Sequence, residues 1–402
     1  MLENQDIVCI APNPWDQTWM RRQQLMSRFA VGNRVLYVEP ANLLLSALLS
    51  RKGLARLLNG ALFLHRDRKH PFILSQYRLL PFEETSLHKG VDLVKKINDW
   101  FCVTMLQRAL KRLDFNRPIL WLYYTPRREG FIGKCHEKLV VCDVFDRYSA
   151  YPYNASDPWL KDLTDREDAN LIGKADIVFA SSEPLFSYCR EFNQRVYLVL
   201  NGTDTSLLNQ TPTAPEDMAH IQHPVLGYVG AIFDKLDFEI LSHTAEKHPE
   251  WTILMIGPSN TTSDEAGKLL STLRGKKNVL FLGSKLQAQL PGYYEAIDVA
   301  LMPYKLDEHT DHIFPLKMFE YMAFRKPIVS TDIPAARQFA DVISIAHTRE
   351  QFIDSVSMSL SNDNSQRTQW GFEIAQQNSW DKRVEELSQV IQARLYDKTI
   401  AH

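Results

Sequence analysis

The sequence predicts an α/β fold of two tandem, doubly wound, Rossmann-like parallel-sheet domains that face a cleft. Three observations lead to this prediction. The chain has 402 residues, which is too long for one hydrophobic core. Short, almost wholly apolar segments alternate with helix-like segments, as in a parallel sheet covered by helices on both faces. The alternation stops at the polar, proline-containing segment 207–223 and then begins again.

The first domain is predicted over residues 1–206. Its strands are short aliphatic runs, at 7–11, 34–39, 118–123, 139–144, 177–180 and 195–200. Helices are predicted between them, at 19–29, 42–58 and 91–113. The Asn-Gly pair at 201–202 indicates a tight turn after the last strand.

Residues 207–223 are the predicted linker, and residues 224–380 are the predicted second domain. Its strands are predicted at 225–229, 252–256, 279–282, 299–302 and from 328. Its helices are predicted at 237–247, 265–273, 290–295 and from 315. The final segment, 381–402, is expected to hold a helix that packs back on the first domain.

The composition is that of a soluble globular protein, with 45% hydrophobic and 23% charged residues. No apolar run approaches the roughly 18 residues that a membrane-spanning helix needs, and the first residues do not have the pattern of a secretory leader. The five cysteines are odd in number and form no Cys-x-x-Cys pair, which indicates reduced thiols. We therefore expect a cytoplasmic protein.

The charge is unevenly distributed. Residues 1–140 contain 22 Lys and Arg against 12 Asp and Glu, whereas residues 141–402 contain 24 against 36. A basic first part indicates an anionic partner. Within 43–58, leucines occur together with Arg51, Lys52 and Arg56. Such a helix either lies peripherally on the inner face of the cytoplasmic membrane or covers the sheet with its charges in solvent.

The segment 298–334 predicts a strand, a polar loop at 305–312, a helix from Pro315 and another strand. Lys317 and Glu320 are three residues apart, so they share one face of that helix. A helix N-terminus with a nearby cation suits a phosphate, and a carboxylate suits a sugar hydroxyl. The alternative is a surface ion pair on an ordinary helix.

A second candidate lies after the strand at 225–229. Gly230 permits a close backbone approach, and Lys235 can reach a phosphate. The alternative is a simple strand-to-helix turn with Asp237 as the helix N-cap. No Gly-x-Gly-x-x-Gly, P-loop or Asp-x-Asp motif occurs, which disfavours a dinucleotide, P-loop or metal-dependent site. Although Glu308, His309, Asp311 and His312 superficially resemble a metal cluster, no metal is expected.

The second half resembles GT4-like (family 1) glycosyltransferases of GT-B architecture. The segments that carry the resemblance are 227–231, 251–258, 278–283, 302–305, 315–323 and 326–330. The chain is most similar to teichuronic-acid-type polysaccharide biosynthesis glycosyltransferases. That likeness includes 21–24, 36–39 and 201–204 and covers nearly the whole chain.

The resemblance implies a donor site in the second domain. Glu320 matches the second glutamate of the family's Glu-x7-Glu element, which binds the donor ribose. His312 stands where the first glutamate is expected, and His312, Asp311 or Lys317 is the implied substitute. The implied donor-binding residues are Gly230, Ala231, Lys235, Leu282, Gly283, His312, Phe314, Leu316, Lys317 and Glu320. Gly230 and Lys235 fall at the pyrophosphate, and Leu282 and Gly283 at the nucleobase.

The resemblance also implies an acceptor site in the first domain, formed by Trp15, Arg21, Arg22, Tyr124 and Asp143. Many relatives place a histidine after the mid-sheet strand, and here Asp143 or Asp146 takes its place. We favour Asp146, which lies further into the loop. The expected catalytic residues are Asp146, Lys317 and Glu320.

The predicted function is metal-independent, retaining transfer of a sugar from a nucleotide-diphospho-sugar, preferably a UDP-sugar. The expected acceptor is a cell-envelope polysaccharide or a lipid-linked saccharide, such as one on polyprenyl diphosphate. No cofactor and no nucleic acid are expected. Two alternatives stay open, namely a sugar-nucleotide epimerase of GT-B shape and a catalytically inactive partner protein, which the missing first glutamate motivates.

Overall fold

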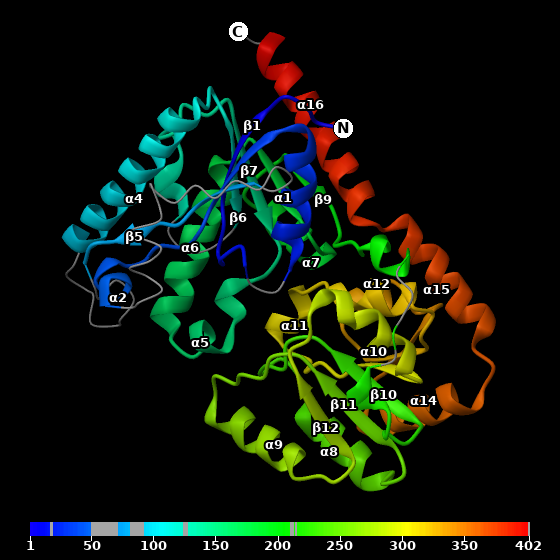
Figure 1. Cartoon of the computed structure of the whole chain (residues 1–402). Coiled ribbons are helices and arrows are strands. Elements are labelled where there is room, and N and C mark those ends of the chain that lie inside the picture. The colour runs from blue at the N-terminus through cyan, green and yellow to red at the C-terminus, as the bar shows by residue number, and fades with distance from the viewer. Residues whose placement is uncertain are drawn as a thin grey trace.

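A computed structural model gives the structure of residues 1–16, 19–49, 71–80, 92–123, 128–209, 213 and 215–400. It contains two α/β units with separate parallel sheets (Figure 1). The predicted fold class is confirmed. The two main sheets lie on either side of the segment 207–223, while the domain bounds themselves remain a prediction.

The first sheet has seven strands in the order β4-β2-β1-β6-β7-β8-β9, and its paired strands are parallel. They are β1 (Asp6–Ile10), β2 (Arg34–Val38), β4 (Phe72–Leu74), β6 (Ile119–Tyr123), β7 (Leu139–Val144), β8 (Ile177–Ala180) and β9 (Val196–Leu198). A separate pair joins β3 (Asn42–Leu43) and β5 (Tyr77–Arg78). The helices are α1 (Arg21–Gly32), α2 (Leu44–Leu49), α4 (Asp92–Leu113), α5 (Pro152–Ala155), α6 (Pro158–Lys174) and α7 (Glu183–Arg190).

The second sheet has six parallel strands in the order β12-β11-β10-β13-β14-β15. They are β10 (Val225–Val229), β11 (Thr252–Ile256), β12 (Val279–Gly283), β13 (Val299–Met302), β14 (Ile328–Thr331) and β15 (Ile343–Ala346). Its helices are α8 (Phe238–Lys247), α9 (Asp264–Arg274), α10 (Leu290–Ala296), α11 (Glu308–His312), α12 (Leu316–Ala323), α13 (Pro334–Arg337), α14 (Arg349–Ser361) and α15 (Ser365–Gln377). The chain then forms α16 (Trp380–Ile400).

Both faces of the first sheet are buried, as the apolar strands predict. Along β1, Val8 and Ile10 belong to one hydrophobic cluster, whereas Ile7 and Cys9 belong to another. Successive side chains of a strand point to opposite faces, so each face has its own core. All five cysteines are buried thiols. Within the described ranges, no helix combines the length and the apolar character that crossing a membrane requires.

Three local predictions were wrong. The predicted helix at 42–58 begins with the two-residue strand β3, and the structure describes α2 as far as Leu49, so residues 50–58 lie outside the described part. The polar loop at 305–312 contains α11, because Asp307 caps it by accepting a hydrogen bond from the Thr310 N–H at 2.9 Å. The first helix begins at Arg21 rather than at residue 19.

The chain crosses between the two sheets twice, and the two crossings are bonded to each other. Thr203 donates from its N–H to the Asn378 carbonyl at 2.9 Å, and Trp380 donates to the Thr203 carbonyl at 3.0 Å. A Cβ on Gly202 would lie 2.9 Å from the Trp380 nitrogen, so only glycine fits there. The Asn-Gly turn is therefore also a junction with the start of α16.

Helix α16 packs on the first domain although it follows the second in sequence (Figure 1). Trp380, Val384, Leu387 and Ile391 recur every three or four residues and share a buried cluster with β1. This spacing gives the helix one continuous apolar stripe. The helix therefore completes the core of a domain that lies hundreds of residues earlier in the chain.

We expect Leu387→Ala to lower the free energy of unfolding by about 2–5 kcal/mol, because Leu387 is fully buried and its truncation leaves a cavity. Chemical denaturation followed by circular dichroism measures this change. The exposed neighbour Glu385 provides the control, since Glu385→Ala should change stability by less than about 0.5 kcal/mol. Equal stability of the two variants would show that α16 does not contribute to the core.

Candidate functional site

Helix α12 begins where the second domain meets the first. Asn201 donates from its side-chain amide to the Phe314 carbonyl at 2.7 Å. Leu316 is half-buried against the cluster that contains β1. Pro315 is the N-cap and supplies no side-chain acceptor to the first turn. The first turn of α12, with the positive end of its dipole, thus lies at the domain interface.

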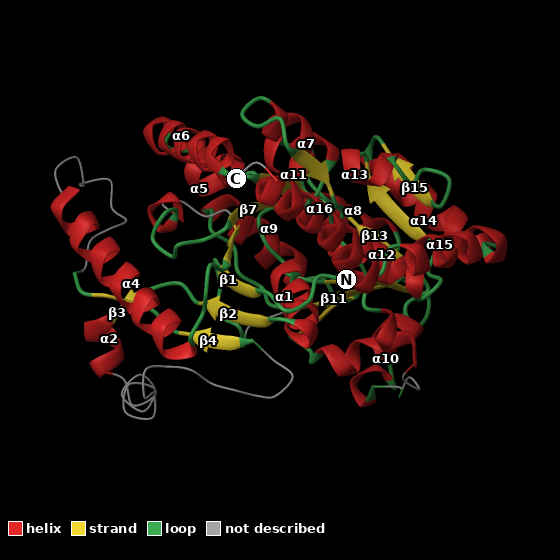
Figure 2. Ribbon diagram, turned by 90° about the horizontal axis from the view of Figure 1, so that it is seen from above, coloured by secondary structure: helices red, strands yellow, loops and turns green. Residues whose placement is uncertain are grey.

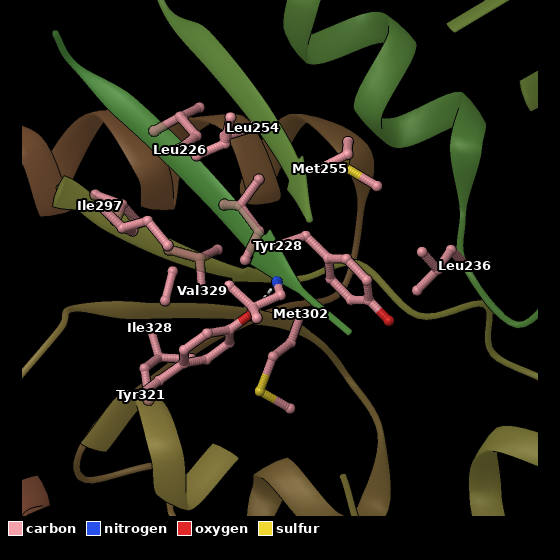
Figure 3. Close-up of a cluster of buried hydrophobic side chains, with 14 of the residues drawn as sticks. Leu226, Tyr228, Leu236, Leu254, Met255, Ile297, Met302, Tyr321, Ile328 and Val329 are labelled. Carbon is pink, nitrogen blue, oxygen red and sulfur yellow. Dashed lines mark hydrogen bonds between the residues drawn. The ribbon is translucent and has the colours of Figure 1, made fainter. Parts of the chain in front are cut away.

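Lys317 is buried at the start of this helix. Its Nζ donates to the hydroxyls of Tyr228 at 2.8 Å and Tyr304 at 3.2 Å, and it lies 4.1 Å from the centre of the Tyr228 ring. Figure 3 shows Tyr228 among the core side chains of the second domain. Burial, followed by the nearby charge of Lys235, lowers the pKa of Lys317 well below its usual value. An ammonium so poorly solvated is stabilised by an added anion.

Gly230 makes the close approach that its sequence context predicts. Its φ is +145°, and a Cβ added there would lie 2.6 Å from Lys317 Nζ. The next residue, Ala231, is half-buried and accepts a hydrogen bond from Tyr228 Oη at 2.9 Å. Any larger residue at position 230 would displace the lysine.

Lys235 lies in the loop that follows. Asp234 anchors this loop by accepting hydrogen bonds from Thr262 and Ser263. Burial lowers the pKa of Lys235, and the negative charge of Asp146 opposes that shift. Asp237 caps α8 by accepting from the Ile240 N–H at 2.9 Å, so the turn reading of this segment is also correct.

Glu320 is half-buried and is not a surface ion-pair partner of Lys317. Its Oε2 accepts a hydrogen bond from the Tyr294 hydroxyl at 2.7 Å. Burial raises the pKa of Glu320, while the Tyr294 hydrogen bond and then Lys317 lower it. Lys317 and Glu320 therefore keep separate tyrosine partners, and the structure does not support the alternative of an ordinary surface pair.

Asp146 comes from the loop after β7 in the first domain and meets the second domain. Its Oδ2 accepts from the Tyr151 hydroxyl at 2.5 Å. Its Oδ1 is buried, has no hydrogen-bond partner among the described residues, and lies 3.5 Å from His309 Nε2. His309 is 6% exposed, and its ring centre lies 4.3 Å from that of Tyr151. Asp146, the favoured acidic residue, thus lies beside the second domain.

The structure buries Asp143 and Arg21, two predicted acceptor residues, against each other. Arg21 Nε lies 3.0 Å and 3.1 Å from the two Asp143 oxygens, and its Nη1 donates to the carbonyls of Val199 and Leu200. The side chains are 3% and 0% exposed. The pair therefore links α1 to β7 and to the segment after β9, and an acceptor contact of these two residues stays a prediction.

The other predicted acceptor residues lie nearby, with one exception. Arg22 is buried, with its guanidinium carbon 5.6 Å from the Phe145 ring centre. Trp15 is half-buried and packs on Tyr37, with 5.0 Å between ring centres. Tyr124 lies outside the described residues. Trp15 thus lies in the loop after β1, and Arg22 lies in the helix that follows this loop, α1.

His312 lies at the end of α11, the helix that precedes α12. Its Nδ1 lies 2.7 Å from the Glu308 carbonyl on its own helix, and Asp311 is exposed. The contact with the first domain comes from the His312 backbone, whose carbonyl accepts from Ser182 Oγ at 2.6 Å. The histidine that faces Asp146 is His309. No group of three or more potential metal ligands is found in the part of the chain that the structure describes.

Leu282 and Gly283 lie at the end of β12, near the two glycines after β10 and β11. Gly283 has a φ of +67°, and its carbonyl accepts from the Gly257 N–H at 2.9 Å. Gly257 in turn leaves room for the Gly230 carbonyl, which a Cβ would meet at 2.1 Å. These backbone contacts join the predicted nucleobase and pyrophosphate segments along one edge of the sheet.

Sequence reasoning missed the aromatic groups of the site and His309. Tyr228 and Tyr304 hold Lys317, Tyr294 holds Glu320, and Tyr151 holds Asp146. Tyr228 and Tyr304 fall inside segments already singled out, so their position was a usable signal. Tyr151, Tyr294 and the role of His309 depend on contacts between distant segments, which no local pattern reveals.

The two α/β domains with separate parallel sheets have the GT-B fold. Sucrose-phosphate synthase from Thermosynechococcus elongatus has a similar fold, with a TM-score of 0.73 over 97% of this chain and 99% of that one at 15% identity. Anabaena HepE, solved with UDP and glucose, has a TM-score of 0.65 over 97% of this chain and 100% of its own at 13% identity. At these identities the likeness establishes the fold alone.

The family comparison is more specific. Residues 223–362 match the family described as glycosyl transferases group 1. TuaH of Bacillus subtilis (strain 168), named as a teichuronic acid biosynthesis glycosyltransferase, is 31% identical over 204 residues. That match covers 46% of this chain and 50% of TuaH, so the chain spans about half the length of this relative. The second domain thus has the sequence pattern of group 1 glycosyl transferases, as the resemblance predicts.

Proposed function

We propose that this protein is a metal-independent, retaining glycosyltransferase that uses a nucleotide-diphospho-sugar, preferably a UDP-sugar. The observation that carries the proposal is the buried Lys317 at the start of α12, beside Gly230 and near Lys235. Two poorly solvated ammonium groups beside a helix N-terminus suit a diphosphate. Glu320, one turn along the same helix, is placed to accept the ribose hydroxyls.

The chemistry follows from these positions. As the bond between the sugar and the diphosphate breaks, negative charge develops on the leaving phosphate, where Lys235, Lys317 and the helix N-terminus stabilise it. The acceptor oxygen bonds to the anomeric carbon on the face that the diphosphate leaves, and its proton passes to the leaving phosphate, so the configuration is retained. Asp146, on the other side of the interface, orients the acceptor hydroxyl and stabilises the positive charge that develops on the sugar. No step in this scheme needs a metal ion. The relatives support the donor class, since one solved GT-B structure holds UDP and glucose and another holds UDP-2-fluoro glucose.

The acceptor in this proposal is a cell-envelope polysaccharide or a saccharide linked to polyprenyl diphosphate, reached at the membrane surface. The name of TuaH supports a polysaccharide. Leu45 and Leu48 of α2 and Leu93 and Trp100 of α4 are exposed by 48–70%. Leu44 of α2 and Phe101 of α4 pack against one small cluster, Tyr77 and Met105, so the two helices belong to the same part of the first domain (Figure 2). Exposed apolar side chains on a basic domain favour a lipid surface.

One observation favours a second candidate, a catalytically inactive partner protein. His312 replaces the first glutamate of the family element, and its ring bonds to its own helix. An inactive partner would give no transfer with any nucleotide-sugar. The epimerase alternative predicts another result, namely release of an epimerised sugar without an acceptor.

We expect Glu320→Gln to weaken nucleotide-sugar binding by about 10- to 100-fold, because a charged acceptor of the ribose hydroxyls is lost. Calorimetry with UDP-, GDP- and dTDP-sugars first identifies the donor and then compares the variants. The exposed Glu295 serves as control, and Glu295→Gln should bind like the wild type. Equal affinity of wild type and Glu320→Gln would refute the ribose assignment.

We expect nucleotide binding to take up protons at pH values between the pKa of Lys317 in the free protein and its pKa in the complex. The pKa of Lys317 is lowered in the free protein, and a bound diphosphate should raise it. Between these two pKa values the complex holds more protons than the free protein, so affinity rises as the pH falls. Calorimetry in buffers of different ionisation enthalpy measures the uptake. Lys317→Met should abolish this uptake, and an unchanged uptake would assign it to another group.

We expect the protein to sediment with anionic vesicles, and Leu45→Asp with Leu48→Asp to reduce that binding at least about tenfold by adding charge to the apolar face. Vesicles of phosphatidylglycerol and phosphatidylcholine test the dependence on lipid charge. Leu286→Asp changes a leucine of similar exposure in the second domain and should have no effect. Loss of binding in all variants alike would contradict the assigned surface.

A further inference from the structure

We propose that His309 is a positioning residue that donates from Nε2 to Asp146 Oδ1 across the domain interface and so orients this carboxylate for the reaction. The inference rests on the proposed transferase function and adds a residue to it. Nothing in the predicted Glu-x7-Glu pattern points to His309, which lies three residues before the position of the missing glutamate.

The carboxylate of Asp146 is incompletely hydrogen-bonded. One oxygen, Oδ2, is held by Tyr151 at 2.5 Å. The other, Oδ1, is buried and accepts no hydrogen bond from the described residues, although His309 Nε2 lies only 3.5 Å away. A buried carboxylate oxygen without a donor is unfavourable. A shift of a few tenths of an ångström would bring Nε2 to the usual N–H···O distance of about 3.0 Å and satisfy that oxygen.

The His309 ring is held in place by its surroundings. The residue is 6% exposed, and its ring packs on Tyr151 with 4.3 Å between centres. Its helix α11 is tied to the first domain on both sides of His309. Lys161 Nζ lies 2.6 Å from Glu308 Oε2, and Ser182 bonds the His312 carbonyl. A ring held in this way can set the direction of a carboxylate.

Asp146 lies close to the predicted donor lysines. Lys235 Nζ and Lys317 Nζ lie 5.9 Å and 5.6 Å from the centre of the Tyr304 ring, so one tyrosine joins the two lysines. Burial lowers the pKa of Lys235 and the negative charge of Asp146 opposes this shift, which indicates that this carboxylate lies near the lysine pair. A diphosphate at the lysines would place its sugar next to Asp146. The direction in which that carboxylate points then decides which acceptor hydroxyl it can engage.

Several other titratable groups lie on α11 or on segments that contact it. They are Asp146, Arg147, Tyr151 and Lys161 from the first domain, and Glu308, Asp311, His312 and Arg337 from the second. His312 differs from His309 because its ring bonds to the Glu308 carbonyl. Of the two histidines on α11, His309 is therefore the one placed to act on Asp146.

The test compares His309→Phe, which keeps a ring but has no donor, with His309→Gln, which keeps a donor near Nε2 but does not titrate. With the donor sugar identified by binding, His309→Phe should lower kcat by about 10- to 100-fold and change the donor KM by less than about twofold. His309→Gln should restore most of the rate.

A double-mutant cycle separates positioning from general damage. In an Asp146→Asn background, His309→Phe should cause no further loss, because the carboxylate that it orients is gone. His347→Gln is the matched control, since His347 lies 3.0 Å from an aspartate, Asp332, on the exposed surface and should keep full activity. Calorimetric binding of the nucleoside diphosphate checks that each variant is folded.

Two results would overturn the proposal. One is wild-type kcat in His309→Phe, and the other is an equal loss in the wild-type and Asp146→Asn backgrounds. If His309→Phe does not fold, His309→Leu, which also lacks a donor, replaces it in both comparisons. Failure of the proposed function looks different, because the wild type itself would then bind no nucleotide-sugar and transfer none.

Discussion

The structure of the site depends on the ion pair and the hydrogen bonds by which the first domain fixes the segment between β13 and α12. Lys161, Ser182 and Asn201 of the first domain bond to Glu308, His312 and Phe314, respectively, and two of these bonds go to backbone carbonyls. Because every residue has a backbone carbonyl, these bonds fix the path of the chain whatever the side chains are. That path delivers α12, with Lys317 and Glu320, to the interface.

The site also contains a buried charged side chain. The second domain keeps Lys317 in a tyrosine environment without a carboxylate partner within ion-pair distance among the described residues. Burying a charge is costly unless it is paired, and hydroxyl and ring contacts compensate only in part. In the first domain, by contrast, the buried guanidinium of Arg21 has a carboxylate partner, with Nε 3.0 Å from Asp143 Oδ1. The paired charges stabilise the fold, whereas the incompletely paired ones are suited to a ligand.

The sequence predicted most of the fold, whereas the roles of the site residues stay predictions. Apolar runs such as 225–229 and 299–302 match strands residue for residue, because a buried parallel strand needs apolar side chains on both faces. Short or edge elements such as β4 and β15 were not predicted, since three or four residues give little periodicity. Lys317 and Gly230 were proposed from local context alone. The pairing of Asp143 with Arg21 was not predicted because the two are 122 residues apart in sequence, and the contact of His309 with Asp146 was not predicted because Asp146 belongs to the other domain.

The bonded crossings at Thr203 and Ser379 have a mechanical consequence. Two chain segments, side by side, connect the two domains. Together they resist twisting and shear more than a single linker does, so bending about one line is the softest motion. The tight fit at Gly202 keeps the segments in register during such bending. If the interface opens by such bending, α11 moves away from the loop of Asp146 while the junction at Thr203 and Ser379 stays closed.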